Sequence, residues 1–164
     1  MRTTRLISRV IAVMQLFALG SCTLSSDAAL EKSFYRHDVE LERLRELFAE
    51  ERRFREVTTR FTRPSAAIGS AEGMPYDRFN MYRSYFTAIG ISGVLRRDDG
   101  AILFTANAVG ALTKARYKGY AYLSASPVST YDQLDQVPDT ELTDCDPHYK
   151  HIKGRWYLYA IDCL

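Results

Sequence analysis

The chain has 164 residues, of which 46% are apolar and 26% are charged, and this composition excludes collagen-like, purely coiled-coil and disordered proteins. Its length fits one domain. The 22 basic and 20 acidic residues give a formal charge of +2. Residues 1–21 hold three of the arginines and no acid, so the remainder has 19 basic against 20 acidic residues. This near-neutral remainder has no electrostatic footprint for nucleic acid, and no nucleic-acid partner is expected.

The first segment has the order of a secretory signal. Its three arginines precede an apolar run from Val10 to Leu19, and small residues follow. The run is too short for a membrane-spanning helix, which needs about 20 apolar residues. A stable transmembrane helix is therefore the weaker interpretation of this segment.

The tetrapeptide Leu19-Gly20-Ser21-Cys22 resembles the lipobox of bacterial lipoprotein precursors. The resemblance implies removal of residues 1–21, a diacylglyceryl thioether on Cys22 and acylation of the new N-terminus, with several acyl chains giving durable membrane anchoring. Thr23 resembles the residue of lipoproteins sorted to the outer membrane. Ordinary signal cleavage nearby, with Cys22 unmodified, is the alternative. We expect a lipid-anchored tether over residues 22–29 and a single domain over residues 30–164.

The two remaining cysteines, Cys145 and Cys163, form an even pair, which in an exported chain suggests a disulfide. Strands are predicted over 148–152 and 156–161, on either side of a turn centred on Gly154. Both cysteines are nine residues from Gly154, so this hairpin would place them opposite each other. Two free thiols are the alternative.

Helices are predicted in the first half of the domain. Apolar residues recur at helical intervals from Leu30 to Phe61, with His37 on the same stripe and charges on the other face, which predicts one long amphipathic helix over 28–60. We expect the charged residues of this helix to face solvent. The alternative is that this face of the helix binds a partner. A loop follows over 64–74. Pro75 then begins a second helix with an aromatic stripe that we expect in the core.

Strands are predicted in the second half. They begin near Ala88, and Asp99-Gly100 is a strong hairpin turn before a strand over 101–106. Residues 107–118 are expected to connect to a third strand over 119–124. Thr130 and Gln133 fit a capping box for one helical turn, and 138–147 form an acidic loop.

This order predicts an α+β fold with an antiparallel sheet of about five strands and one or both helices on one face. From Tyr82 onward the chain resembles a loose group of small uncharacterised bacterial envelope proteins. The similar pieces are Tyr85-Phe86 before Ile89-Gly90-Ile91, then Gly119-Tyr120 and Trp156-Tyr157-Leu158-Tyr159. This resemblance implies no activity and transfers no functional residue.

The best metal-site candidate is the set Asp144, Asp146, His148 and His151, which offers carboxylates and imidazoles close together in sequence. The histidine spacing of three points them to opposite faces of a strand, which weakens this candidate. No Gly-x-Ser-x-Gly nucleophile motif is present, and His37 is expected to be a packed residue. We therefore expect no enzyme activity and no cofactor.

Tyrosines are dense in the last third of the chain, where they suit either a half-buried sheet or a recognition surface. They are Tyr117, Tyr120, Tyr122, Tyr149, Tyr157 and Tyr159. We expect a lipid-anchored, non-enzymatic binding module facing the periplasm, whose partners are the membrane through Cys22 and an envelope protein or component. An immunity-type or inhibitor protein is a variant within this class. The alternative is a metal-assisted envelope hydrolase that uses the four-residue cluster.

Overall fold

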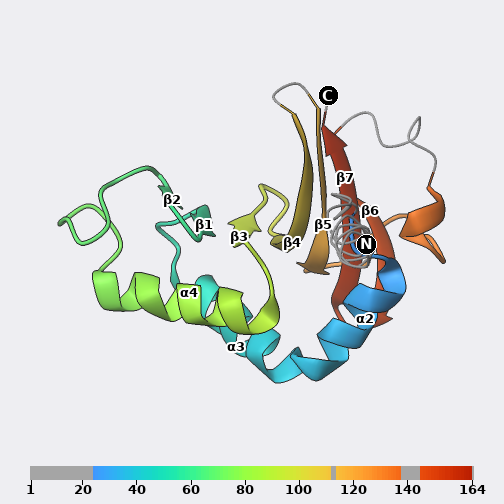
Figure 1. Ribbon diagram of the computed structural model, residues 1–164, viewed down its shortest axis with the longest axis horizontal. Coiled ribbons are helices and arrows are strands. Elements are labelled where there is room, and N and C mark those ends of the chain that lie inside the picture. Colours follow the sequence, from blue (N-terminus) through green and yellow to red (C-terminus); the bar gives the residue numbers. More distant parts are fainter. Residues whose placement is uncertain (1–23, 112–113, 138–144, 164) are drawn as a thin grey trace, which may run out of the picture.

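The computed structural model describes residues 24–111, 114–137 and 145–163 (Figure 1). The predicted signal segment, the lipidation site Cys22 and Asp144 lie outside these residues. In the described part, three α-helices pack with one antiparallel sheet, which confirms the α+β class. The sheet has seven strands instead of about five, because the sequence pattern does not predict two short strands at one edge.

The helices are α2, α3 and α4, and a 3-10 turn, η2, follows later in the chain. Their bounds are Asp27–Arg36 for α2, Asp38–Glu50 for α3, Tyr76–Ile89 for α4 and Leu134–Gln136 for η2. The prediction of one helix over 28–60 is therefore wrong, whereas the second helix after Pro75 is confirmed. None of the described helices is long and apolar enough to cross a membrane.

The break between α2 and α3 lies at His37, which ends one helix and precedes the next. Its N–H still donates to the carbonyl of Phe34, and its carbonyl accepts from Leu41, so His37 itself stays hydrogen-bonded to both helices, whereas no side chain caps the start of α3. The next buried side chain after Phe34 is Leu41, seven residues on. A spacing of seven also fits a continuous helix, which is why the apolar pattern did not reveal the break.

Residues 51–63 leave the helix and build the first edge of the sheet. Strand β1 covers Glu56–Thr58 and β2 covers Thr62–Arg63, and they pair in an antiparallel hairpin. Val57 is fully buried, and Phe54 before it is also in the core. These apolar residues continue the helical interval of α3 by coincidence, and they were misread as part of that helix.

The remaining strands complete the sheet in the order β2-β1-β3-β4-β5-β7-β6, with antiparallel neighbours throughout. Their bounds are Gly93–Arg96 for β3, Ile102–Ala111 for β4, Lys114–Tyr122 for β5, His148–Lys153 for β6 and Trp156–Cys163 for β7. The strand expected near Ala88 begins later, since α4 runs to Ile89 and ends in a left-handed Gly90.

The Asp99-Gly100 turn between β3 and β4 is confirmed. The N–H of Arg97 donates to Ala101 O across the turn, and Gly100 has a φ of +84°. The expected connection over 107–118 is wrong, because β4 and β5 stay paired from Asn107↔Lys118 to Ala111↔Lys114. This hairpin rises above β1 and β3 in Figure 1.

The C-terminal hairpin has the predicted register over four residue pairs, from His148↔Ala160 to His151↔Tyr157. A turn centred on Gly154 also predicts that Ile152 pairs with Trp156, and this is wrong, because the register shifts there and Lys153 faces Trp156 instead. The capping box is also wrong: η2 begins after Gln133, and no side chain caps it.

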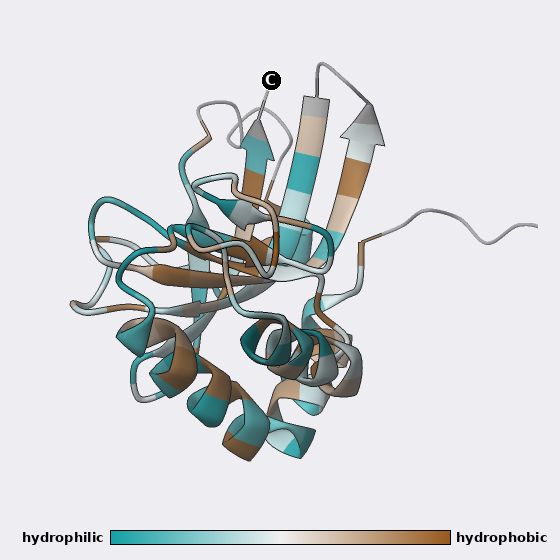
Figure 2. Ribbon diagram, turned by 90° about the vertical axis from the view of Figure 1, so that its left-hand side faces the viewer, coloured by the Kyte–Doolittle hydropathy of each residue, from teal (hydrophilic) through white to brown (hydrophobic). Residues whose placement is uncertain are grey.

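Two apolar clusters lie on the two faces of the sheet. The helices cover one face, where Phe34, Leu44 and Phe86 meet Tyr120 and Leu158 of the strands. Figure 2 shows the hydrophobic and hydrophilic residues sharing each helix, as expected for helices with one buried side. The second cluster lies on the other face, and its buried members are Ala101, Leu103, Ala121, Leu123, Tyr149, Tyr157, Tyr159 and Ile161.

The predicted disulfide is compatible with the backbone around Cys145. The Cys145 N–H donates to Asp162 O at 3.2 Å, next to the end of β7 at Cys163. The side chain of Cys163 lies outside the described residues, so the pairing itself stays a prediction. Non-reducing peptide mapping is expected to recover the two cysteines in one linked product.

Reduction of that bond is expected to lower the free energy of unfolding by about 3 kcal/mol, because it would release a closed loop of 17 intervening residues in the unfolded chain. Denaturant titrations with and without reductant measure the loss. A Cys22→Ala variant is the control and should keep the linked product. Recovery of Cys145 and Cys163 as separate free thiols from native material would contradict the prediction.

Candidate functional site

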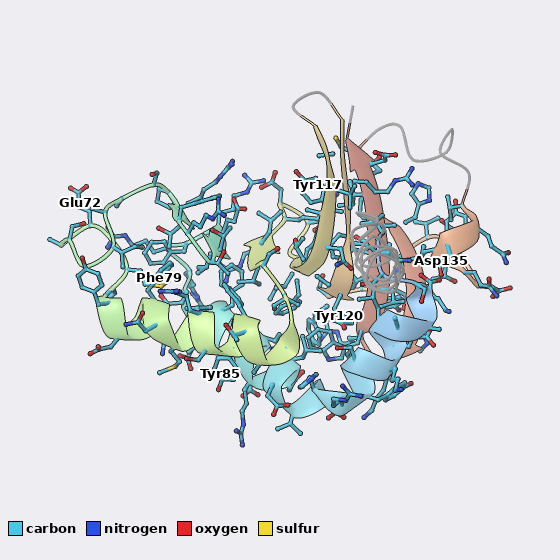
Figure 3. The ribbon with its side chains drawn as sticks, in the orientation of Figure 1. Glu72, Phe79, Tyr85, Tyr117, Tyr120 and Asp135 are labelled. Carbon is cyan, nitrogen blue, oxygen red and sulfur yellow. The ribbon has the colours of Figure 1, made fainter. Side chains whose placement is uncertain are left out.

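A groove of about 900 Å³ crosses the sheet face opposite the helices. Its floor comes from Leu103 of β4 and from Tyr159 and Ile161 of β7, all of which are buried. Tyr117 of β5 is half-buried and stands at the side of the β4–β5 hairpin, where Figure 3 labels it. The groove therefore has a largely apolar floor and polar walls, and it is bordered on one side by a projecting hairpin and on the other by β1 and β2.

The hydroxyl groups in the floor are paired with each other. Thr105 Oγ1 and Tyr159 Oη lie 3.0 Å apart and share a hydrogen bond. Burial raises the pKa of Tyr159 well above its ordinary value. The phenol stays neutral and bonded to Thr105, so it places no charge in the floor of the groove.

The opposite side of the groove is rich in arginine. Residues 52–63 contain five arginines and one glutamate, although residues 22–164 as a whole are almost neutral. The five are all exposed, and they are Arg52, Arg53, Arg55, Arg60 and Arg63. We call this stretch the arginine hairpin. Phe61, between the two strands of the same hairpin, is 42% exposed and also lines the groove.

Three arginines line the groove itself, together with a single carboxylate, Glu56. Arg63 pairs with Glu56 at 2.8 Å, and Arg55 pairs with Asp98 at 3.2 Å. Arg97 pairs with Asp99 at 3.2 Å. Exposed ion pairs of this kind contribute at most about 1 kcal/mol each, so an anionic ligand can compete for these guanidinium groups.

A second constellation, the Lys118 network, lies on the helix side of the sheet. Lys118 of β5 is 2% exposed, and it pairs with Asp27 at 2.6 Å and with Asp135. Asp27 also accepts from the N–H of Leu134 at 2.6 Å. Lys150 of β6, two strands away from β5, pairs with Glu31 at 2.7 Å and lies 3.7 Å from Asp27. The charges of these groups are paired with each other, although Asp27 Oδ1 makes no hydrogen bond of good geometry.

The pKa of Asp135 is set by its contacts within the Lys118 network. Burial alone would raise the pKa of Asp135, but the hydrogen bonds from Lys118 and from the Asp27 N–H outweigh it and hold that pKa below its usual range. The network ties the first turn of α2 to β5 and η2. We interpret it as a structural element, because its members have partners within the network.

A smaller hollow of about 460 Å³ lies between the α2–α3 junction and the turn of the β6–β7 hairpin. Its walls carry charges of both signs, and Lys153 pairs with Asp38 across it at 3.6 Å. The Trp156 ring forms part of the floor, and its Nε1 donates to Glu42 at 3.2 Å. Because acidic and basic side chains both line this hollow, its charge favours neither anionic nor cationic ligands.

The candidate metal cluster of the alternative function is not assembled in the described residues. Asp146 is exposed, and Asp144 lies outside the description. His148 packs its ring on Tyr131 at 5.0 Å, and His151 binds Gly154 O at 3.1 Å through Nε2. His148 pairs with Ala160 of β7, and His151 pairs with Tyr157. Because the two histidines are three residues apart on one strand, their side chains point to opposite faces of the sheet, as their spacing in the sequence predicts. No group of three or more possible ligands is placed to hold a metal within the described part of the chain.

Most of the six tyrosines in the last third of the chain pack in the cores on the two faces of the sheet. Four of them are buried, at 9% exposure or less: Tyr120, Tyr149, Tyr157 and Tyr159. Tyr120 donates to Leu30 O at 3.1 Å on the helix side, and Tyr122 lies between the guanidinium groups of Arg45 and Arg155 at 4.8 and 5.1 Å. Tyr117 and Tyr159 alone among the six line the groove.

The buried phenols predict a loss of stability at alkaline pH. Burial raises the pKa of Tyr149 to about 12, against about 10 in an unfolded chain. The folded state therefore holds this proton more tightly, and its contribution to stability is complete below about pH 10 and is lost as pH rises toward 12. Urea unfolding across this range measures the loss. A Tyr149→Phe variant should flatten the decline, and an unchanged slope would contradict the assignment.

The arginine hairpin was missed at the sequence level. The sequence pattern places Arg52, Arg53 and Arg55 on the solvated face of a long helix. The signal that argues against this is the β-branched run Val57-Thr58-Thr59, which favours a strand. The groove could not be foreseen, because its lining comes from strands far apart in sequence.

Comparison with known proteins adds no relative. No family model, no curated protein and no solved structure matches the chain. The functional interpretation consequently depends on the geometry of the groove and the arginine hairpin.

Proposed function

We propose that this chain is a bacterial envelope lipoprotein that is anchored through lipid on Cys22, faces the periplasm from the outer membrane and binds a partner protein without catalysing a reaction. The lipobox-like tetrapeptide supports the anchoring. The groove beside the arginine hairpin carries the binding role. We assign it an extended, acidic segment of an envelope protein with interspersed apolar side chains.

Charge and shape together support this partner. The apolar floor suits aliphatic or aromatic side chains, whereas the exposed guanidinium groups of Arg55 and Arg63 suit carboxylates. Arginine is enriched in protein interfaces because its planar fork binds carboxylates in a bidentate manner. Complementary charge on the rim would raise the association rate and select against basic partners.

The binding role is tested with the purified full-length protein in a non-ionic detergent. The probe is a short peptide of alternating valine and glutamate, and its counterpart has lysine in place of glutamate. We expect the glutamate peptide alone to bind, with an affinity that falls as salt increases. Equal binding of the two peptides, or of neither, would contradict the proposed partner.

Matched variants locate the site. The double variant Arg55→Gln with Arg63→Gln is expected to weaken binding about tenfold, equivalent to about 1.4 kcal/mol. The double variant Arg43→Gln with Arg83→Gln is the control, because both are exposed arginines, on α3 and α4, and these helices pack on the other face of the sheet. Equal losses in both variants would show that binding follows total charge and not the groove.

The anchor is tested separately by intact mass and by membrane fractionation of the native protein. We expect a chain that begins at acylated Cys22 and sediments with membranes, and a Cys22→Ala variant that leaves the membrane fraction. A native chain that still begins at Met1 would contradict the anchoring and leave the groove experiment unaffected.

A further inference from the structure

The upper part of β4 has a free side. The register of β4 with β3 ends at Gly93↔Thr105, whereas its register with β5 continues to Ala111. From Asn107 onward β4 therefore has a strand partner on one side alone within the described residues. Figure 1 shows the same arrangement, with the β4–β5 hairpin standing above β3.

Hydrogen-bond alternation identifies which backbone groups of β5 point at β4. The N–H of Leu123 donates to Arg155 O at 3.0 Å, so the odd-numbered residues of β5 bond to β7. The even-numbered residues, among them Arg116 and Lys118, therefore bond to β4.

The same alternation identifies the free groups of β4. Lys118 faces Asn107 and Arg116 faces Val109, so the backbone groups of Asn107 and Val109 are used by β5. The N–H and C=O groups of Ala108 and Gly110 point away from β5, and both residues are exposed. Ala108 and Gly110 therefore present two N–H and two C=O groups outward, at the alternate positions through which an additional β-strand would form hydrogen bonds.

Within the described residues, the one protection at this edge is the β-bulge between Thr105 and Asn107, at the base of the free part of β4. Soluble proteins block open edges with lysine, proline, very short strands or covering segments. Asn107–Gly110 has neither lysine nor proline, and its outward residues are small. Ala108 also lines the groove, so the open edge and the proposed binding channel form one continuous surface.

We infer that the partner segment binds by strand addition, as an extra β-strand along Ala108 and Gly110 with its side chains alternating into the groove. This inference deepens the proposed function and depends on it. Hydrogen bonds between the backbones would supply affinity. Every second side chain of the partner segment would contact the apolar floor or the arginine hairpin, and these contacts would supply specificity.

Amide hydrogen exchange of the full-length protein tests the inference with the same valine–glutamate peptide. The amides of Ala108 and Gly110 are expected to exchange fast without peptide and at least about tenfold more slowly with it, as their N–H groups become paired. The amides of Asn107 and Val109 serve as internal controls and should be slow in both states. Binding without protection of Ala108 and Gly110 would overturn strand addition and leave the groove function standing, whereas no binding would overturn both.

A proline variant gives a second readout. Ala108→Pro removes one outward donor, and it leaves intact the groups that face β5. We expect it to weaken peptide binding at least tenfold, whereas Ala108→Ser binds as the parent protein does. Full binding by Ala108→Pro, with an unchanged circular dichroism spectrum, would overturn the inference.

Discussion

Replacement of Lys118 by methionine is expected to lower the free energy of unfolding by about 3–5 kcal/mol. The substitution keeps most of the side-chain volume, but it leaves the carboxylate of Asp27 buried without its closest cation, at 3% exposure. Removing one partner of a buried ion pair costs this much because the remaining charge has lost both water and its counter-charge. Denaturant unfolding followed by circular dichroism measures the change.

The exposed pair Arg55–Asp98 provides the control. Arg55→Met removes a cation at a comparable distance from its partner, but both side chains are mostly solvent-exposed, so the loss should stay below about 1 kcal/mol. The double variant Lys118→Met with Asp27→Asn should recover part of the stability, since the orphaned charge is gone. Equal effects of Lys118→Met and Arg55→Met would contradict the structural role of the Lys118 network.

Gly119→Ala is the second substitution with a large expected effect, about 3 kcal/mol or more. A Cβ at this position would lie 2.0 Å from Phe104 O and 2.8 Å from the Ala106 nitrogen. Both atoms belong to the backbone of β4, next to its register shift between Thr105 and Asn107, so no side-chain rotation can relieve the contact. The strand pair must separate locally, and thermal or urea unfolding should show the loss.

Gly154→Ala is the matched control for glycine replacement. Gly154 has a φ of +59°, but nothing lies within 4 Å of its added Cβ. Only the left-handed backbone penalty applies, which is about 1–2 kcal/mol. A smaller loss for Gly119→Ala than for Gly154→Ala would mean that β4 and β5 do not approach as closely as described.

Local signals were enough to predict some elements of this fold. The α4 helix, the Asp99-Gly100 turn and most of the C-terminal register depend on residues close together in sequence, and all three are confirmed. Their turns contain glycine at the positions that need positive φ, which limits the possible registers.

The errors have physical causes. The seven-residue interval across His37 fits both a straight and a broken helix, and small residues in the upper β4–β5 hairpin give no strand pattern. The candidate site was out of reach for a different reason. Asp27 and Lys118 form an ion pair, and Phe61 and Tyr159 line one groove, only after the sheet has formed. Hydrophobic periodicity along the chain gives no information about residues that lie about a hundred positions apart in sequence.

The junction at the start of α2 limits how far the domain can stand from its anchor. The Ser25 N–H donates to Asn107 Oδ1 at 3.2 Å, and Asp27 is already buried, so the ordered domain begins earlier than the expected tether boundary at residue 29. With lipid on Cys22, three residues remain, which span at most about 10 Å. A linker of this length would keep the domain in contact with the lipid headgroups of the leaflet in which it is anchored. Under the proposed anchoring, a partner must therefore present its acidic segment at the membrane surface, and ligands deep in the periplasm stay beyond its reach.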